Sequence, residues 1–348
     1  MNSKFLYNLK GIALFATPRF FSQPFLESTL THLLHSLDDK ELEHIKMRLN
    51  YYYNGSLPFV VSPRPSSLSL SNSHNEEMER LSIVAPKFVR LGELYRFRAP
   101  SAYRYDTNEY ARYFPRDFGI YAGFGDVNYY FNAPSITKSR PILKDNANSI
   151  LFKLDKNRHF YFPRDRIRFE DKRDMLFWRG GVYQSNRAEF FTRFFTHPLC
   201  DIGHTGSKHC SQQWAKPKIS VSAHFPYKFL LSLEGNDVAS NLKWIMHSNS
   251  LCFSLKPKYE TWFMEGLLKA DYHYACIKDD FSDVEEKIEF FTRHPNDAKE
   301  IIHNAQEFCM QFLDSKIEDL LCFLVLRKYF TLSRQMRASK QELELFGI

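Results

Sequence analysis

Two arginines, Arg179 and Arg187, flank a glycine turn in the middle of the chain. Arg179 directly follows the apolar run 175–178, which predicts a short buried strand, and Gly180 comes next. Arg187 falls in the first turn of a helix predicted over residues 186–196, where the positive end of the helix dipole disfavours a cation by about 0.3–1 kcal/mol. A strand, a glycine turn, a helix start and arginine together predict a phosphate site with an anion between the two guanidinium groups. The alternative is an Arg179 that pairs with a neighbouring carboxylate.

A second group of residues follows the same pattern further along the chain. Lys228 begins an apolar stretch that predicts a strand over 228–233, and the turn Glu234, Gly235 follows it. Asp237 can then cap the next helix, whose N-terminus would face the same ligand. The alternative is that Lys228 is simply the solvated end of a strand.

A carboxylate that precedes a basic cluster forms the third group. Asp126 comes shortly before Lys138 and Arg140. This arrangement suits a general base beside an anionic substrate. The alternative is an aspartate turn with cations on the surface.

Metal chemistry has little support in the sequence. Four candidate zinc ligands, Cys200, His204, His209 and Cys210, match no familiar zinc spacing, and a buried thiol with two loop histidines explains them better. No two aspartates are spaced as D-x-D, the pair with which metal-dependent sugar transferases usually hold Mg²⁺ or Mn²⁺. We therefore expect no bound metal.

Strands and helices alternate in the second half of the chain. The predicted strands cover 175–178, 199–202, 228–233, 250–255 and 272–277, and the predicted helices cover 186–196, 237–247, 259–269, 283–293 and 297–330. Upstream we expect two helices within 25–53, a loop over 62–77 and a strand over 149–154. This alternation predicts an α/β fold with a parallel sheet, whose ligand binds at the carboxyl ends of the strands. Arg179, Gly203 and the turn at 234–235 should then line one crevice.

The bulk composition limits the class of protein. A chain of 348 residues suits two domains, which we place at 1–170 and 171–330, with a charged C-terminal helix or tail at 331–348. The net charge of +7 favours an anionic partner, but the most basic stretch is interleaved with acidic residues, so we expect no nucleic-acid groove. Six cysteines without a CxxC pair, and the absence of a cleavable signal, predict a cytoplasmic protein. Phe20, Phe21 and Phe25 are candidates for peripheral contact with a membrane.

These pieces, in this order, resemble glycosyltransferase family 90, which includes bacterial lipopolysaccharide core transferases and eukaryotic protein O-glucosyltransferases. The resemblance covers about residues 48–308 and is strongest between 175 and 277. The matching segments are Arg48 with 51–53, Asp126, 138–141, 176–180 with Arg187, 228–236, 250–253, 259–263, and 273–274 before Asp279 and Asp283.

The resemblance implies a GT-B-like fold of two Rossmann-like domains with a cleft between them. It also implies an inverting, metal-independent enzyme with a UDP-sugar donor and no further cofactor. Asp126 would be the catalytic residue and Arg179 the diphosphate ligand. The further donor or substrate contacts would come from Gly180, Arg187, Lys228, Glu234, Gly235, Asn241, Lys138 and Arg140.

One departure from the family pattern points to a branch. Eukaryotic members carry an arginine early in the helix after the glutamate-glycine turn, where this chain has Asn241. The stretch 234–244 is more similar to the lipopolysaccharide branch. We therefore expect a hexosyltransferase that acts on a lipopolysaccharide core sugar at the cytoplasmic face of the inner membrane. A protein O-glucosyl- or xylosyltransferase, and a non-catalytic basic module that binds anionic lipid or nucleic acid, are the alternatives.

Overall fold

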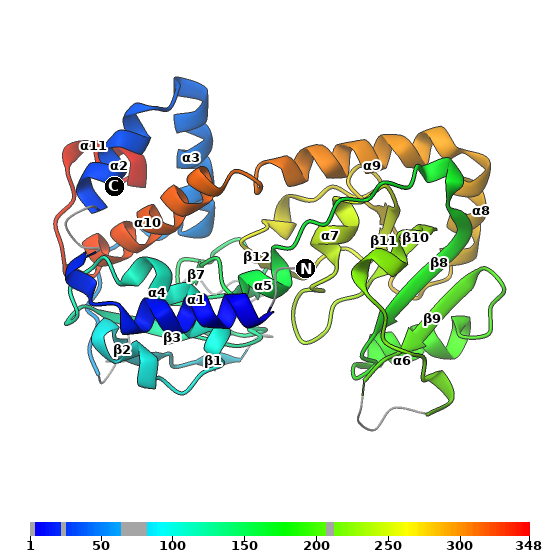
Figure 1. Ribbon diagram of the computed structural model, residues 1–348, viewed down its shortest axis with the longest axis horizontal. Helices are drawn as coiled ribbons and strands as arrows, with labels where there is room; N and C mark the ends of the chain where they lie inside the picture. Colours follow the sequence, from blue (N-terminus) through cyan, green and yellow to red (C-terminus); the bar gives the residue numbers. More distant parts are fainter. Residues whose placement is uncertain (1–3, 22–25, 64–81, 207–211) are drawn as a thin grey trace. The chain divides into compact units, whose positions relative to one another are not determined.

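The computed structural model describes residues 4–21, 26–63, 82–206 and 212–348 (Figure 1). The chain divides into two compact units, and each has its own sheet and core. Unit 1 consists of Arg158–Lys258 and Glu265–Gln311. Unit 2 consists of the residues up to Asn157, Tyr259–Met264 and Phe312–Ile348.

The centre of unit 1 is a parallel sheet with the strand order β13-β11-β10-β8-β9. The five predicted strands of the second half are all present in it, as β8 (Arg173–Gly180), β9 (Cys200–His204), β10 (Tyr227–Ser232), β11 (Leu251–Ser254) and β13 (Ala275–Cys276). The chain adds β9 on one side of β8 and all later strands on the other side. The direction of winding therefore reverses between β8 and β10, which makes that gap the topological switch point where such sheets bind ligands.

Helices cover the sheet of unit 1. They are α6 (Ser185–Phe194), α7 (Leu242–Met246), α8 (Val284–Arg293) and α9 (Pro295–Met310). The strands read as continuous apolar runs because a parallel sheet is buried on both faces. On one face of β8, Trp178 packs edge-on against Phe191 of α6, and on the other face Phe177 stacks on Tyr227.

Unit 2 is built on a smaller sheet with the order β2-β3-β5-β7. Its strands are β2 (Lys87–Arg90), β3 (Gly119–Gly123), β5 (Ser135–Thr137) and β7 (Ser149–Leu151), all parallel to their neighbours except β2. Two short pairs accompany it, β1 (Ile83–Val84) with β4 (Tyr130–Phe131) and β6 (Ser139–Pro141) with β12 (Tyr259–Thr261). Its helices are α1 (Lys4–Ala16), α2 (Leu26–His35), α3 (Asp39–Tyr52), α4 (Ser101–Ala111), α10 (Ser315–Leu332) and α11 (Lys340–Phe346), and α5 (Lys156–His159) lies where the chain passes into unit 1.

Several predicted elements are confirmed and three are corrected. The helix predicted over 237–247 begins only at Leu242, so Asn241 and not Asp237 is at its N-cap. The helices within 25–53 are present, and Asp38 caps the second with a reciprocal bond to Glu41. The helix predicted over 259–269 is wrong, because Tyr259–Thr261 pairs with β6 as an antiparallel strand and a short 3-10 turn follows. The helix predicted over 297–330 is two helices, since the first ends at Met310 and Asp314 caps α10. The loop predicted over 62–77 lies mostly outside the described residues.

The units do not follow the order of the sequence. The chain enters unit 1 at Arg158, earlier than the boundary predicted near residue 170, and it returns to unit 2 at Phe312. Helix α10 belongs to unit 2 because it packs on α3, where Glu318 accepts a hydrogen bond from Arg48 at 2.5 Å. The predicted α/β class with parallel sheets is confirmed. No helix in the described part of the chain is long and apolar enough to cross a bilayer.

Candidate active site

Arg187 joins the carboxyl ends of the two strands at the switch point. Its Nη1 donates to the carbonyl of Gly181 at 2.8 Å, just after β8, and its Nη2 donates to the carbonyl of Leu233 at 2.6 Å, just after β10. Within the described residues, no carboxylate pairs with it and its buried Nε has no hydrogen-bond partner. Burial and the charge of Arg158 lower the pKa of Arg187, Glu234 opposes them, and the net pKa is about 10. The group therefore stays a cation at neutral pH.

The start of α6 lies beside this guanidinium. Gln184 at the N-cap makes no side-chain cap, but Oδ1 of Asn186 accepts from the amide of Arg187 at 2.8 Å within the first turn. No acidic residue lies in this turn, so the positive end of the helix dipole still favours an anion. Two contacts tie the helix start to the turn after β10: Asn186 donates to the carbonyl of Glu234 at 3.3 Å, and Gln184 donates to Asn236 at 3.1 Å. A Cβ atom at Gly235 would lie 3.3 Å from Nη2 of Arg187. Glycine in this turn therefore keeps the guanidinium uncovered.

Arg179 lies against the other face of the sheet. Its Nη2 pairs with the carboxylate of Asp201 at 2.8 Å, and its guanidinium lies 4.2 Å from the ring centre of Phe177. Arg187 lies over the ring of Trp178, the next residue of β8. Successive side chains of a strand point to opposite faces, so the structure does not bring the two arginines together. For Arg179 it shows the carboxylate pair that the sequence had left open as the alternative.

Lys228 and Asn241 lie at opposite ends of β10. Lys228 pairs with Asp174 at 2.6 Å near the amino ends of β10 and β8. The strand continues for four residues beyond it, or roughly 13 Å at about 3.3 Å a residue, before the end where Arg187 binds. Asn241 donates to the carbonyl of Leu231 at 2.9 Å, at the same end as Arg187. The structure groups Gly180, Arg187, the turn at 234–235 and Asn241, and it leaves Lys228 apart.

In unit 2, Asp126 and Lys138 meet at the carboxyl ends of two parallel strands. Asp126 follows β3 and Lys138 follows β5, and their side chains form an ion pair at 2.7 Å. The Lys138 side chain is buried at 2% exposure, whereas that of Asp126 is 37% exposed. Gly125 has φ of +150°, and a Cβ there would meet nothing within 4 Å. The carboxylate is thus held in place by a buried ammonium and still accessible to a substrate.

Arg140 takes part in the framework of unit 2. Its Nε pairs with Glu260 at 2.7 Å and joins β6 to β12. Its other nitrogens donate to the carbonyls of Tyr52, Ser149 and Tyr51 at 3.3, 2.9 and 2.8 Å. The side chain is buried and all three nitrogens are occupied, so the structure does not bring Arg140 to Asp126.

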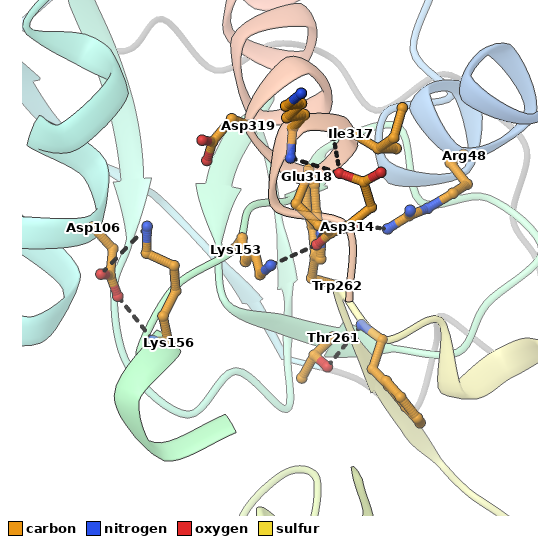
Figure 2. A network of polar contacts seen from close by, with 12 residues as sticks. Arg48, Asp106, Lys153, Lys156, Thr261, Trp262, Asp314, Ile317, Glu318 and Asp319 are labelled. Atoms are coloured by element: carbon orange, nitrogen blue, oxygen red, sulfur yellow. Dashed lines mark hydrogen bonds and ion pairs between the residues drawn. The ribbon is translucent and has the colours of Figure 1, made fainter. Parts of the chain in front are cut away.

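A buried network of polar contacts in unit 2 surrounds Glu318, and no sequence pattern predicts it (Figure 2). Glu318 of α10 accepts from Arg48 of α3 at 2.5 Å, pairs with Lys153 at 2.6 Å and accepts from Trp262 Nε1 at 2.8 Å. Arg48 had been noticed as part of the family resemblance. Its partner is 270 positions away, and neither spacing nor periodicity could have identified it.

The zinc candidates do not form a site in the described residues. Burial raises the pKa of the Cys200 thiol to about 12, and Nδ1 of His204 accepts from the amide of Val182 at 3.0 Å. His209 and Cys210 lie outside the described residues. No group of three or more possible ligands was found in the parts of the chain that the structure describes.

Comparison with known proteins decides the family. The family model described as "Glycosyl transferase family 90" matches residues 158–344, more than half of the chain. The chain belongs to glycosyl transferase family 90. The resemblance inferred from the sequence is confirmed, and the protein is a glycosyltransferase.

Relatives in this family come from bacteria and animals. "O-glucosyltransferase LpsA" of Dichelobacter nodosus is 47% identical over 233 residues, which cover 67% of this chain and 73% of that protein. "O-glucosyltransferase rumi homolog" of Aedes aegypti is 26% identical over 180 residues, 47% of this chain and 43% of that protein. "Protein O-glucosyltransferase 1" of Rattus norvegicus is 28% identical over 162 residues, 44% of this chain and 41% of that protein. The matches to the two animal proteins thus span less than half of their length.

The family 90 match divides the candidate residues into two sets. Gly180, Arg187, Gly235 and Asn241 lie inside the matched span. Asp126 and Lys138 precede it, so their assignment depends on the family resemblance seen in the sequence and on the geometry of unit 2.

Proposed function

We propose that this glycosyltransferase moves a hexose from a UDP-sugar to a hydroxyl group of a lipopolysaccharide core sugar. The observation that carries the donor half is Arg187, a partly buried cation held by two carbonyls at the switch point of a parallel sheet. The name of the bacterial relative, O-glucosyltransferase LpsA, favours glucose as the hexose. The similarity of the stretch 234–244 to the lipopolysaccharide branch of the family favours a lipopolysaccharide acceptor.

The pyrophosphate of the donor suits the end of the sheet where Arg187 lies. Arginine can bind two phosphate oxygens at once, and the start of α6 adds the positive end of its helix dipole. An anion there would offset the burial of the guanidinium and its repulsion from Arg158. By analogy with oxyanion donors, one such contact supplies about 10²–10³ in turnover.

In the proposed reaction, Asp126 accepts the proton of the acceptor hydroxyl as the oxygen attacks the anomeric carbon. The bond from that carbon to the UDP oxygen breaks in the same step, with inversion. Arg187 and the dipole of α6 stabilise the charge that develops on UDP, and no metal ion takes part. The proposal requires both units to contact one bound donor, in the two-domain GT-B arrangement implied by the resemblance.

Two substitutions test the two halves separately. Arg187→Met should weaken UDP binding by about 10- to 100-fold, because a hydrogen bond to a charged group contributes about 1.5–3 kcal/mol. Asp126→Asn should reduce transfer by at least about 10²-fold and leave UDP binding unchanged. Arg193→Met, on the exposed surface of the same helix, is the matched control. Isothermal titration with UDP and a UDP-release assay measure both quantities, and full transfer by both site variants would overturn the proposal.

The acceptor and the metal need their own assays. The acceptor assay measures transfer of label from UDP-glucose to truncated lipooligosaccharide core, with a peptide serine as the competing acceptor. Transfer to the core supports a lipopolysaccharide acceptor, and transfer to the peptide supports a protein O-glucosyltransferase. Activity that survives excess EDTA is expected, and loss of activity that Mn²⁺ restores would contradict the metal-independent step.

A further inference from the structure

Helix α1 exposes a continuous apolar face. Its four largest exposed side chains follow a spacing of i, i+1, i+4 and i+7, which places them on one side of a helix. They are Phe5, Leu6, Leu9 and Ile12, at 71%, 62%, 51% and 56% exposure. The 3-10 turn η1 (Arg19–Phe21) continues the apolar surface with Phe20 and Phe21, at 63% and 58%. A surface of this kind normally marks a site of interaction.

The opposite face of α1 fixes this surface outward. Figure 1 shows α1 alongside α4, and Gly11 allows the close approach, because a Cβ there would lie 2.3 Å from the ring of Tyr105. Tyr7 donates to Asp106 of α4 at 2.8 Å, and Lys10 of α1 pairs with an acidic residue of α4 at 2.7 Å. The apolar side chains therefore cannot turn inward without breaking these contacts.

A groove of about 760 Å³ opens where α1 ends. Arg19 and Arg116 line it among apolar side chains that include Phe15 and Phe20. Arg112 is buried close by and donates at 3.2 Å to the carbonyl of Thr17, which also lines the groove. Three arginines thus gather beside the apolar surface.

The positive charge of this groove is not neutralised within the described residues. None of Arg19, Arg112 and Arg116 forms an ion pair there. Asn108 lines the groove at 2% exposure. Its Nδ2 atom and the Nε atom of Arg112 are both buried without a hydrogen-bond partner in the described part of the chain. Between residues 87 and 116 seven basic residues face only three acidic ones. The unpaired N–H donors and the net positive charge of the groove favour binding of an anion with several acceptor oxygens.

We propose that α1 and η1 lie in the surface of an anionic phospholipid bilayer, with their apolar side chains among the acyl chains and a lipid phosphate in the arginine groove. A free phosphate would satisfy the arginines and leave the apolar face in water, whereas a lipid satisfies both. A helix with an apolar face and a basic border is the usual form of such an interfacial segment. This inference does not depend on the transfer reaction.

Vesicle binding by the full chain tests the proposal. Sedimentation with phosphatidylcholine vesicles that contain about one-third phosphatidylglycerol should show binding, and vesicles of phosphatidylcholine alone should bind at least about tenfold less. Leu9→Gln/Ile12→Gln should weaken binding to the anionic vesicles by at least about tenfold. Arg116→Gln should weaken it by about fivefold, since one basic residue near the surface contributes about that much.

Matched controls distinguish binding through this surface from nonspecific hydrophobic adsorption. Leu57→Gln/Val60→Gln removes two exposed apolar side chains elsewhere in unit 2, at 79% and 67% exposure, and should leave vesicle binding unchanged. Hydrolysis of the UDP-sugar should be the same in all these variants, so failure here is distinct from failure of the proposed reaction. Equal binding by Leu9→Gln/Ile12→Gln and the wild type would overturn the proposal. The proposal would also be overturned if the wild type did not bind vesicles and light scattering showed a dimer that Leu9→Gln/Ile12→Gln abolishes.

Discussion

Two arginines, the buried Arg48 in unit 2 and the partly buried Arg187 in unit 1, are held in opposite ways. Arg48 in unit 2 bonds the hydroxyl of Tyr52 and the carboxylate of Glu318, and these two partners raise the pKa of Arg48 even though burial alone would lower it. The side chain of Arg187 in unit 1 donates to two backbone carbonyls, and burial is the main reason that its pKa falls to about 10. The charge of Arg48 is neutralised inside the fold, whereas the charge of Arg187 is available to a bound anion.

The difference separates framework from site. A buried ion pair contributes little net stability, but losing one member is costly because the other charge stays buried. An arginine bonded to carbonyls satisfies its N–H groups and still attracts an anion. By the same criterion, Arg140 and Arg179 resemble Arg48, since each pairs with a carboxylate.

The largest effect is expected at Glu318. Glu318→Ala leaves Arg48 and Lys153 without their shared carboxylate in the core of unit 2, so the free energy of unfolding should fall by about 3–5 kcal/mol. Urea denaturation followed by circular dichroism measures it. Asp314→Ala, which removes only the cap of the same helix, should cost about 1 kcal/mol.

A double substitution sharpens this result. Arg48→Met/Glu318→Leu removes both charges together and should recover much of the loss, because apolar residues replace a buried pair at little cost. A loss below about 1 kcal/mol for Glu318→Ala would show that this pair is not framework, and the contrast with Arg187 would fail.

The second effect concerns ligand-dependent stability at Arg187. UDP at 100 times its dissociation constant should stabilise the wild type by about 2.7 kcal/mol. If Arg187→Met weakens UDP binding about 100-fold, the same UDP concentration should stabilise the variant by only about 0.4 kcal/mol. Thermal unfolding with and without UDP measures both values. Arg179→Met should keep most of the stabilisation, and the reverse ranking would mean that the pair with Asp201 opens to admit the donor.

The sequence was informative where local patterns decide the structure. Apolar runs predicted all five strands of unit 1. The rule for parallel sheets predicted Arg179, Gly203 and the turn at 234–235 in one crevice, whereas the structure brings Arg187, the other arginine of the predicted phosphate site, to Gly235. The place of Asp126 before a basic cluster predicts a base near Lys138 and Arg140, and the structure pairs it with Lys138 because β3 and β5 are parallel. Patterns of this kind depend on residues that are close in the chain or on the order of its elements.

The sequence failed where the outcome depends on which face a side chain takes or on a distant partner. Arg179 and Arg187 are eight positions apart, yet the alternation of β8 places them against opposite faces of the sheet. Arg140 became framework because β12, far away in the chain, brings Glu260 to it. Such pairings could not be seen without the register of the strands.

A third, smaller effect is expected at Asp201. Burial alone would raise its pKa, but hydrogen bonds from Lys216 and Arg179 outweigh burial and hold it below its usual value. A depressed folded-state pKa adds stability above the unfolded pKa of about 3.9 and loses it as the pH falls below that value. Asp201→Asn should therefore cost about 1 kcal/mol at pH 7 and progressively less below about pH 4. Urea unfolding across this range measures it, and a cost that grows in acid would contradict the pairing. The control is Asp279→Asn at an exposed position. It should change neither the free energy of unfolding at pH 7 nor its dependence on pH.

The smallest effect is expected at Lys228, which tests whether the donor is confined to one end of the sheet. Its partner Asp174 is 53% exposed, so Lys228→Met should change the free energy of unfolding by about 0–1 kcal/mol. Because Lys228 lies at the amino end of β10, UDP affinity should stay within about twofold of the wild type, far above that of Arg187→Met. Titration with UDP measures it, with Arg193→Met again as the matched cation. A drop of tenfold or more at Lys228 would mean that the donor reaches the amino end of the sheet, so that a cation paired with a carboxylate can still serve the site.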